Sequence, residues 1–253
     1  MWNFLIINPM INALLFIYNL LGQNFGLAII VFTALIRLLT LPLTIQQTRS
    51  SLVMKEIQDS DKWKKIQEKY KDNREKLSEE QMKLFQEKGY NPFSGCLGTL
   101  IQFPIILGLY QAVIRTLASS PAQLLELTSH LYSPNAALNF FPSQLIPLNS
   151  SFLWMNLGQP ERWAPDFLPI AIPVLTIIVV VSSFIQSKLT TVDTSGDGQG
   201  AMMSNMMSIY MPALMGYFAY TLASGLALYF VVSNLLGIIQ GYVMRQIRKS
   251  ANA

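Results

Sequence analysis

The feature that most constrains this chain is a single arginine in the middle of a long apolar run. Arg37 lies near the middle of Phe25–Ile45, a run long enough to cross the roughly 30 Å hydrocarbon core of a bilayer at about 1.5 Å per residue. An arginine at the centre of a span costs about 2.5–3.5 kcal/mol on insertion scales. The position therefore predicts water or polar partners inside the membrane. The alternatives are a tilted helix with a snorkelling arginine and a soluble protein with a buried ion pair.

The charged residues are concentrated in one stretch of the chain. Only 13% of the 253 residues are charged and 51% are hydrophobic, whereas soluble proteins carry about 25% charged residues. Of the 18 lysines and arginines, 11 fall between Arg49 and Lys88, together with 9 of the 14 acidic residues. This segregation predicts an all-α, multi-pass membrane protein with one polar insert. With one cysteine and one histidine, we expect no disulfide, no metal site and no cofactor.

Hydropathy divides the chain into five membrane spans. The asparagines of the first 24 residues fall largely on one helical face, which predicts an interfacial amphipathic helix at Met10–Leu21, with a spanning helix as the alternative. Ala223–Gly225 offers a turn between the last two spans, which can also be read as one hairpin. The expected order is an extracytoplasmic interfacial helix (1–24), first span (25–45), cytoplasmic helical hairpin (46–95), second span (96–117), extracytoplasmic segment (118–166), third span (167–187), cytoplasmic linker (188–205), fourth span (206–223), fifth span (224–244) and cytoplasmic tail (245–253).

Lysine and arginine in the loops predict the orientation. The insert after the first span carries 11 of them and the tail adds Arg245, Arg248 and Lys249, so both segments are expected in the cytoplasm and the N-terminus outside. Helical spacing divides the insert into Gln46–Tyr70 and Arg74–Lys88. We interpret this hairpin as a docking element, although a charged loop can also be only a topology signal.

Several polar side chains accompany Arg37 within the predicted spans. Thr33 and Thr40 lie about one turn away on the same helical face. Gln111 and Gln240 are interpreted as contacts between helices, which is the usual role of an intramembrane amide. The remaining candidates for a shared polar interior are Gln102 of the second span, Gln186 of the third, and Tyr229 and Ser233 of the fifth.

The predicted spans contain no acidic residue. A proton-coupled transporter normally places carboxylates in the membrane, and a cation channel needs an acidic ring or a carbonyl filter. Phosphate-loop, zinc and catalytic-triad motifs are also absent, so we expect no enzyme. A lone cation without a counter-ion indicates that the substrate brings the negative charge. One alternative is a small transporter or channel for an anionic solute that binds at Arg37.

Four segments of the chain resemble the YidC/Oxa/Alb family of membrane protein insertases, in its bacterial YidC type. The resemblance implies five core helices around a hydrophilic groove that opens to the cytoplasm and to lipid, in the bacterial inner (plasma) membrane. It also predicts that the large periplasmic domain of some members is missing. The matching segments are Asn24–Leu43 (NFGLAIIVFTALIRLLTLPL), Asn91–Tyr110 (NPFSGCLGTLIQFPIILGLY), Phe152–Leu157 (FLWMNL) and Leu222–Gln240 (LASGLALYFVVSNLLGIIQ).

The resemblance also implies a function and assigns residues to it. Arg37 occupies the groove arginine position, Gln186 matches a polar groove residue, and Phe230 stands where relatives often carry tryptophan or tyrosine. An insertase of this kind acts as a chaperone: it receives nascent membrane proteins in the groove and releases their hydrophobic segments into the bilayer. The implied partners are nascent membrane proteins and lipid, with the ribosome, the signal recognition particle pathway and the Sec translocon as further candidates and no specific nucleic acid.

Overall fold

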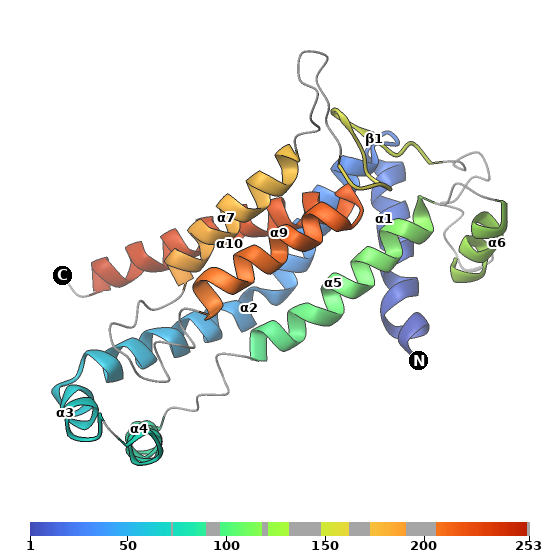
Figure 1. The fold of residues 1–253 in the computed structure, drawn as a ribbon. Helices are drawn as coiled ribbons and strands as arrows, with labels where there is room; N and C mark the ends of the chain where they lie inside the picture. The colour runs from blue at the N-terminus through green and yellow to red at the C-terminus, as the bar shows by residue number, and fades with distance from the viewer. Residues whose placement is uncertain are drawn as a thin grey trace.

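Helices form nearly all of the regular structure in the part of the chain that can be described (Figure 1). The computed structural model describes residues 1–71, 73–89, 97–117, 121–131, 148–161, 173–190 and 206–251. In chain order the elements are the π-helical turn η1 (Asn3–Ile7), α1 (Asn8–Leu20), α2 (Phe25–Asp59), α3 (Asp61–Lys69), α4 (Arg74–Glu87), α5 (Leu97–Thr116), α6 (Pro121–His130), β1 (Ser151–Phe152), β2 (Met155–Asn156), α7 (Val174–Thr190), the π-helical turn η4 (Met206–Tyr210), α9 (Met211–Thr221) and α10 (Ser224–Ala251).

Among the described residues, three helical stretches are long and apolar enough to cross a membrane. They are Asn3–Leu20, Phe25–Thr48 and Ser224–Met244, and Val174–Leu189 is a shorter apolar helix. Together with the composition, these helices make the chain an all-α, multi-pass membrane protein. Helix α10 packs against α7, α9, α2 and α5, so it is the common partner of the bundle.

The first span and the start of the polar insert are one continuous helix. Hydropathy predicts a boundary at residue 45, whereas α2 runs for 35 residues from Phe25 to Asp59, or roughly 52 Å. Asn24 caps its start, because the side-chain Oδ1 accepts from the Leu27 N–H at 3.0 Å. Residues 46–59 contain no glycine or proline, so nothing local ends the helix until Ser60 adopts an extended conformation.

The hairpin of α3 and α4 has a small core of its own at the end of α2. Trp63 of α3 and Phe85 of α4 pack with their ring centroids 5.4 Å apart, over Ile57 of α2. Met82 of α4 lies outside this core and is exposed. In Figure 1 this hairpin and the C-terminal end of α10 (Ser224–Ala251) lie at one end of the bundle, and the two short strands lie at the other.

The N-terminal helix packs into the bundle along its length. It begins at Asn3, seven residues before the predicted start, and contacts both α2 and α5. The missing side chain of Gly108 permits the contact with α5, because an added Cβ would lie 2.6 Å from Ile6 and from the Met10 sulfur. The asparagine face is partly covered: Asn12 is buried and donates to the His130 carbonyl at 3.0 Å. Whether this helix spans or lies at the interface stays a prediction.

A short antiparallel ribbon ties together the helix ends opposite the hairpin. Strands β1 and β2 pair Phe152 with Met155, and the Phe152 ring covers Gly26 of α2. The segment just after β2 also contacts α10. The N–H of Ser224 donates to the Gln159 carbonyl at 2.8 Å, and the N–H of Gly225 donates to the Leu157 carbonyl at 2.9 Å. The FLWMNL segment is therefore a structural clasp for α2 and α10.

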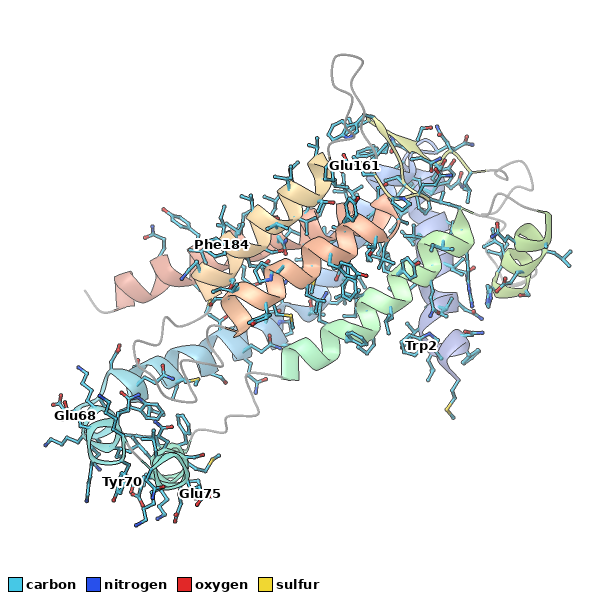
Figure 2. All side chains as sticks on the ribbon, in the orientation of Figure 1. Trp2, Glu68, Tyr70, Glu75, Glu161 and Phe184 are labelled. Carbon is cyan, nitrogen blue, oxygen red and sulfur yellow. The ribbon has the colours of Figure 1, made fainter. Side chains whose placement is uncertain are left out.

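Glu161 extends this clasp to α7 (Figure 2). Its side chain is only 5% exposed, and its two oxygens accept from the Trp154 indole N–H at 2.7 Å and the Leu175 backbone N–H at 2.5 Å. The Trp154 indole therefore helps to hold a buried carboxyl group.

We expect Glu161→Gln to destabilise the protein by about 1–3 kcal/mol, because glutamine presents one oxygen and one NH2 group to two N–H donors. The melting midpoint of the purified protein in detergent measures this effect. Glu75→Gln, at an exposed position on α4, is the matched control and should leave the midpoint unchanged. Equal midpoints for the two variants would contradict the role given to Glu161.

Candidate functional site

Arg37 is held by one residue of α10. Its Nε donates to the Ser233 hydroxyl at 3.0 Å, and its Nη2 donates to the Ser233 carbonyl at 2.7 Å. Arg37 lies 12 residues after the start of α2, or about 18 Å along the helix. The deep arginine predicted from the sequence therefore has polar protein partners, and they come from α10, which is 196 residues away in the chain.

The partners of Arg37 are electrically neutral. Among the described residues, the ion pairs involve α3, α4, α5 and α6, and none involves Arg37. A guanidinium stays protonated in proteins and carries five N–H donors. Two of these donors bond to Ser233, so the positive charge is solvated locally but not cancelled.

Ser233 belongs to a chain of polar groups that reaches α5. The side chain of Tyr229, one turn earlier on α10, lies next to that of Ser233. The Gln102 amide of α5 donates to the same Tyr229 hydroxyl. We call Arg37, Ser233, Tyr229 and Gln102 the Arg37 cluster; it brings together four of the eight predicted site residues on three helices.

The two threonines beside Arg37 bond to their own helix. The Thr33 hydroxyl donates to the Ile29 carbonyl at 2.6 Å, and the Thr40 hydroxyl donates to the Ile36 carbonyl at 2.9 Å. Thr33 exposes none of its surface, so it contributes to packing and offers no group to a ligand. Thr40 is partly exposed and remains a candidate for the site.

The structure places Gln186 of α7 against α10, and Phe230 beside Tyr229 of the Arg37 cluster. Gln186 lies against Gly237, where an added Cβ would collide with its amide nitrogen. Phe230 is buried, and its ring centroid lies 5.7 Å from that of Tyr229. The absence of a side chain at Gly237 therefore lets α7 pack against α10 with its Gln186 side chain at this position.

A further polar contact between α7 and α10 involves residues that the sequence-based prediction of the site does not include. The Asn234 amide donates to the hydroxyls of Ser182 and Ser183 at 3.0 and 2.7 Å. The available signal was the pair of adjacent serines in the apolar run VVVSSFIQ, opposite a polar residue of the last span. This contact joins α7 to α10 and contains no charge.

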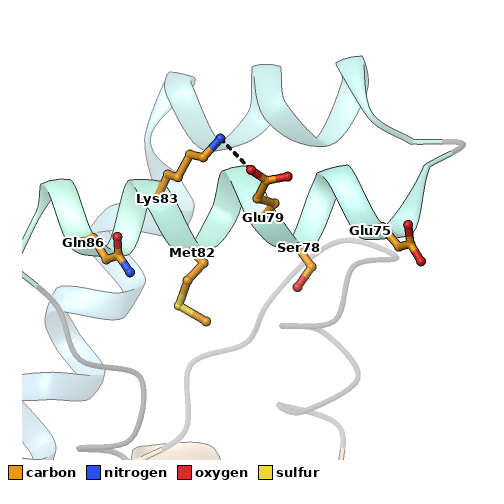
Figure 3. A pocket seen from close by; sticks show the side chains of 6 residues that line it. All are labelled: Glu75, Ser78, Glu79, Met82, Lys83 and Gln86. Carbon is orange, nitrogen blue, oxygen red and sulfur yellow. Dashed lines mark ion pairs between the residues drawn. The ribbon is translucent and has the colours of Figure 1, made fainter.

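Away from the membrane-spanning helices, the hairpin carries an open depression on α4 with a volume of about 640 Å³ (Figure 3). The Lys83 ammonium lies 2.9 Å from Glu79 and 2.8 Å from Glu80 on the same helix. Its hydrogen bond to Glu79 holds the pKa of that carboxyl below its usual range. These groups satisfy one another on an exposed surface, where such pairs contribute little to stability. The lining residues are Glu75, Ser78, Glu79, Met82, Lys83 and Gln86.

Comparison with known proteins identifies the family of this chain. The family model described as 60Kd inner membrane protein matches residues 16–251. The chain is 33% identical to membrane protein insertase YidC 2 of Bacillus anthracis, over 96% of this chain and 81% of the relative. It is 34% identical to membrane protein insertase YidC of Fusobacterium nucleatum, over 90% of this chain and 96% of the relative. The chain belongs to the YidC family of membrane protein insertases.

A solved structure supports the same relationship. The active YidC insertase crystal structure with its first transmembrane domain resolved is 29% identical, has a TM-score of 0.51, and is matched over 88% of this chain and 42% of that one. The resemblance predicted from Asn24–Leu43 and the other three segments is confirmed. The YidC family is not a class of enzymes. Membership of this family does not favour the alternative function, a transporter or channel for an anionic solute.

We expect Tyr229→Phe to lower stability by about 1–3 kcal/mol, because it leaves the Gln102 amide without its partner. In a double-mutant cycle, adding Gln102→Leu to Tyr229→Phe should cost less than Gln102→Leu alone, with a coupling energy of about 0.5–3 kcal/mol. Thermal unfolding in detergent measures the four proteins. Tyr220→Phe, at an exposed position, is the control, and additive losses in the cycle would contradict the contact.

Proposed function

We propose that this chain is an insertase that receives nascent membrane proteins from the cytoplasm in a hydrated groove beside Arg37. The proposal takes the general function from the YidC relatives. The observation that carries the mechanism is the Arg37 charge, held by neutral partners where α2, α10 and α5 meet. The proposed groove has five spans around it and includes Arg37, Thr40 and Gln102.

The proposed orientation follows from the arrangement of the charged segments. The basic hairpin α3–α4 and the C-terminal end of α10 lie at the same end of the bundle (Figure 1). Cytoplasmic segments carry the excess of lysine and arginine, which supports a cytoplasmic position for this end. The clasp at Phe152–Glu161 would then close the bundle on the outside.

In this mechanism, attraction of charge drives the first step and burial of apolar surface drives the second. The Arg37 guanidinium attracts acidic groups in the polar segment of the substrate, and this attraction is stronger in a medium of low dielectric constant than in water. The apolar segment of the substrate then leaves water for lipid, which releases about 25 cal/mol for each Å² of apolar surface buried. No covalent step is required of the protein.

Insertion into proteoliposomes tests the role of the charge. We expect Arg37→Ala to reduce insertion of substrates with acidic translocated segments by at least about tenfold and to spare matched substrates whose acids are replaced by amides, since a charge pair at 4 Å is worth about 4 kcal/mol at an effective dielectric constant of 20. Arg37→Lys should retain much of the activity. Equal loss for both substrate types in a folded protein would argue against attraction of charge, and anion flux without substrate would indicate a channel.

Cysteine labelling tests the water in the groove. In a Cys96→Ser background, Thr40→Cys should react with a membrane-impermeant thiol reagent added from the cytoplasmic side, because the reactive thiolate forms where water stabilises it. Thr33→Cys should stay unlabelled because that position is fully buried, and Leu39→Cys should stay unlabelled because its exposed side faces lipid. Labelling of Thr40→Cys from the outside, or at neither side, would refute a groove open only to the cytoplasm.

A further inference from the structure

We propose that Ser233 is a positioning residue, which orients the Arg37 guanidinium so that one of its edges faces an incoming carboxylate. This inference rests on the proposed function, because it concerns how Arg37 would meet the acidic groups of a substrate. It adds a residue with a specific task and a specific binding geometry to that site. The evidence is the pair of contacts between Arg37 and Ser233 and the way in which Ser233 is itself held.

The two contacts use one edge of the guanidinium. Nε–H and the N–H of Nη2 that lies beside it point in nearly the same direction, and both donate to Ser233, one to its hydroxyl and one to its carbonyl. A guanidinium is planar and rigid, so two bonds from one edge fix both its plane and its rotation. A single contact would leave the group free to turn.

The edge formed by Nη1 and Nη2 is left over. Within the described part of the chain, the partners of Arg37 account for Nε and one N–H of Nη2, and this second edge has none. Two parallel N–H groups match the two oxygens of a carboxylate, which arginine binds in a bidentate manner. The orientation set by Ser233 therefore prepares Arg37 for two-point contact with an aspartate, a glutamate or a C-terminal carboxylate.

Ser233 can hold this orientation because it is itself fixed. It is 5% exposed and lies within α10, one turn after the fully buried Tyr229. Its carbonyl is part of the α10 backbone, so the acceptor for Nη2 cannot rotate away. Both acceptors are uncharged, which keeps the positive charge of Arg37 available to a ligand. A carboxylate in the place of Ser233 would orient the guanidinium equally well but would neutralise it.

The alternative role for Ser233 is that of a small residue for helix packing. A packing defect lowers insertion of every substrate, whereas loss of orientation lowers insertion only where a carboxylate must meet Arg37. The two roles are therefore distinguished by the insertion of the acidic substrate divided by the insertion of the amide substrate. The insertion activity with either substrate alone does not distinguish them.

The test uses the full chain in proteoliposomes with this substrate pair. We expect Ser233→Ala to reduce insertion of the acidic substrate by roughly threefold to tenfold, as expected for losing one hydrogen bond of ordinary net strength while the backbone contact to Nη2 remains, with the amide substrate unchanged. Ser233→Thr, which keeps the hydroxyl, should restore the acidic substrate. Ser233→Cys matches serine closely in shape and has a weak acceptor, so it should behave like Ser233→Ala and provides a second variant if alanine disturbs folding.

A second background separates positioning from other effects. Lysine is a point charge that does not present the two-donor edge of arginine, so adding Ser233→Ala to Arg37→Lys should cause no further loss of the acidic substrate. An equal loss for both substrates, unchanged insertion of both, or a full additional loss in the Arg37→Lys background would overturn the proposal. If Arg37→Ala lowers insertion of the acidic and the amide substrate equally, the proposed function itself is wrong. If Arg37→Ala lowers only the acidic substrate and Ser233→Ala does not, only the positioning role of Ser233 is wrong.

Discussion

The charge of Arg37 sets the condition that the surrounding helices must meet. A guanidinium deep in an apolar bundle has to regain the polar interactions that it loses on leaving water. Ser233 supplies two acceptors at 3.0 and 2.7 Å, one of them from the backbone of α10. Packing of α2 on α10 is therefore coupled to the solvation of the charge. A shift of one helix along the other would break both contacts at once.

Helix α10 combines two kinds of polar contact on different faces. Ser233 and Tyr229 are one turn apart, and they bond to Arg37 of α2 and to Gln102 of α5. Asn234, rotated by about 100° from Ser233, bonds to the paired serines of α7 on another side. The contact with α7 has only neutral groups and fixes one helix pair. The contact with α2 contains a charge that its partners leave uncancelled, so it is the one suited to a ligand.

The sequence predicts the helical class and the arginine within an apolar helix because both depend on local composition. It does not predict that α2 continues to Asp59, since hydropathy follows the surroundings of a residue whereas helix propagation depends on the absence of breakers. Helical spacing correctly puts Thr33 on the side of Arg37, yet it cannot show that packing buries that side chain completely. The bond between Gln102 and Tyr229 joins residues 127 positions apart, and its existence depends on the register of α5 against α10.

Among the described residues, the buried carboxyl group of Glu161 is kept away from the partly buried cation of Arg37. Glu161 is bonded to Trp154 and to the start of α7, beside the first residues of α10. Ser233 lies nine residues after Ser224, or about 13 Å further along that helix, and Arg37 is bonded there. A direct pair between Glu161 and Arg37 would satisfy both groups but would leave no positive charge for a substrate. With separate neutral partners, Glu161 can fasten the helix ends while Arg37 retains its charge in the middle of the bundle.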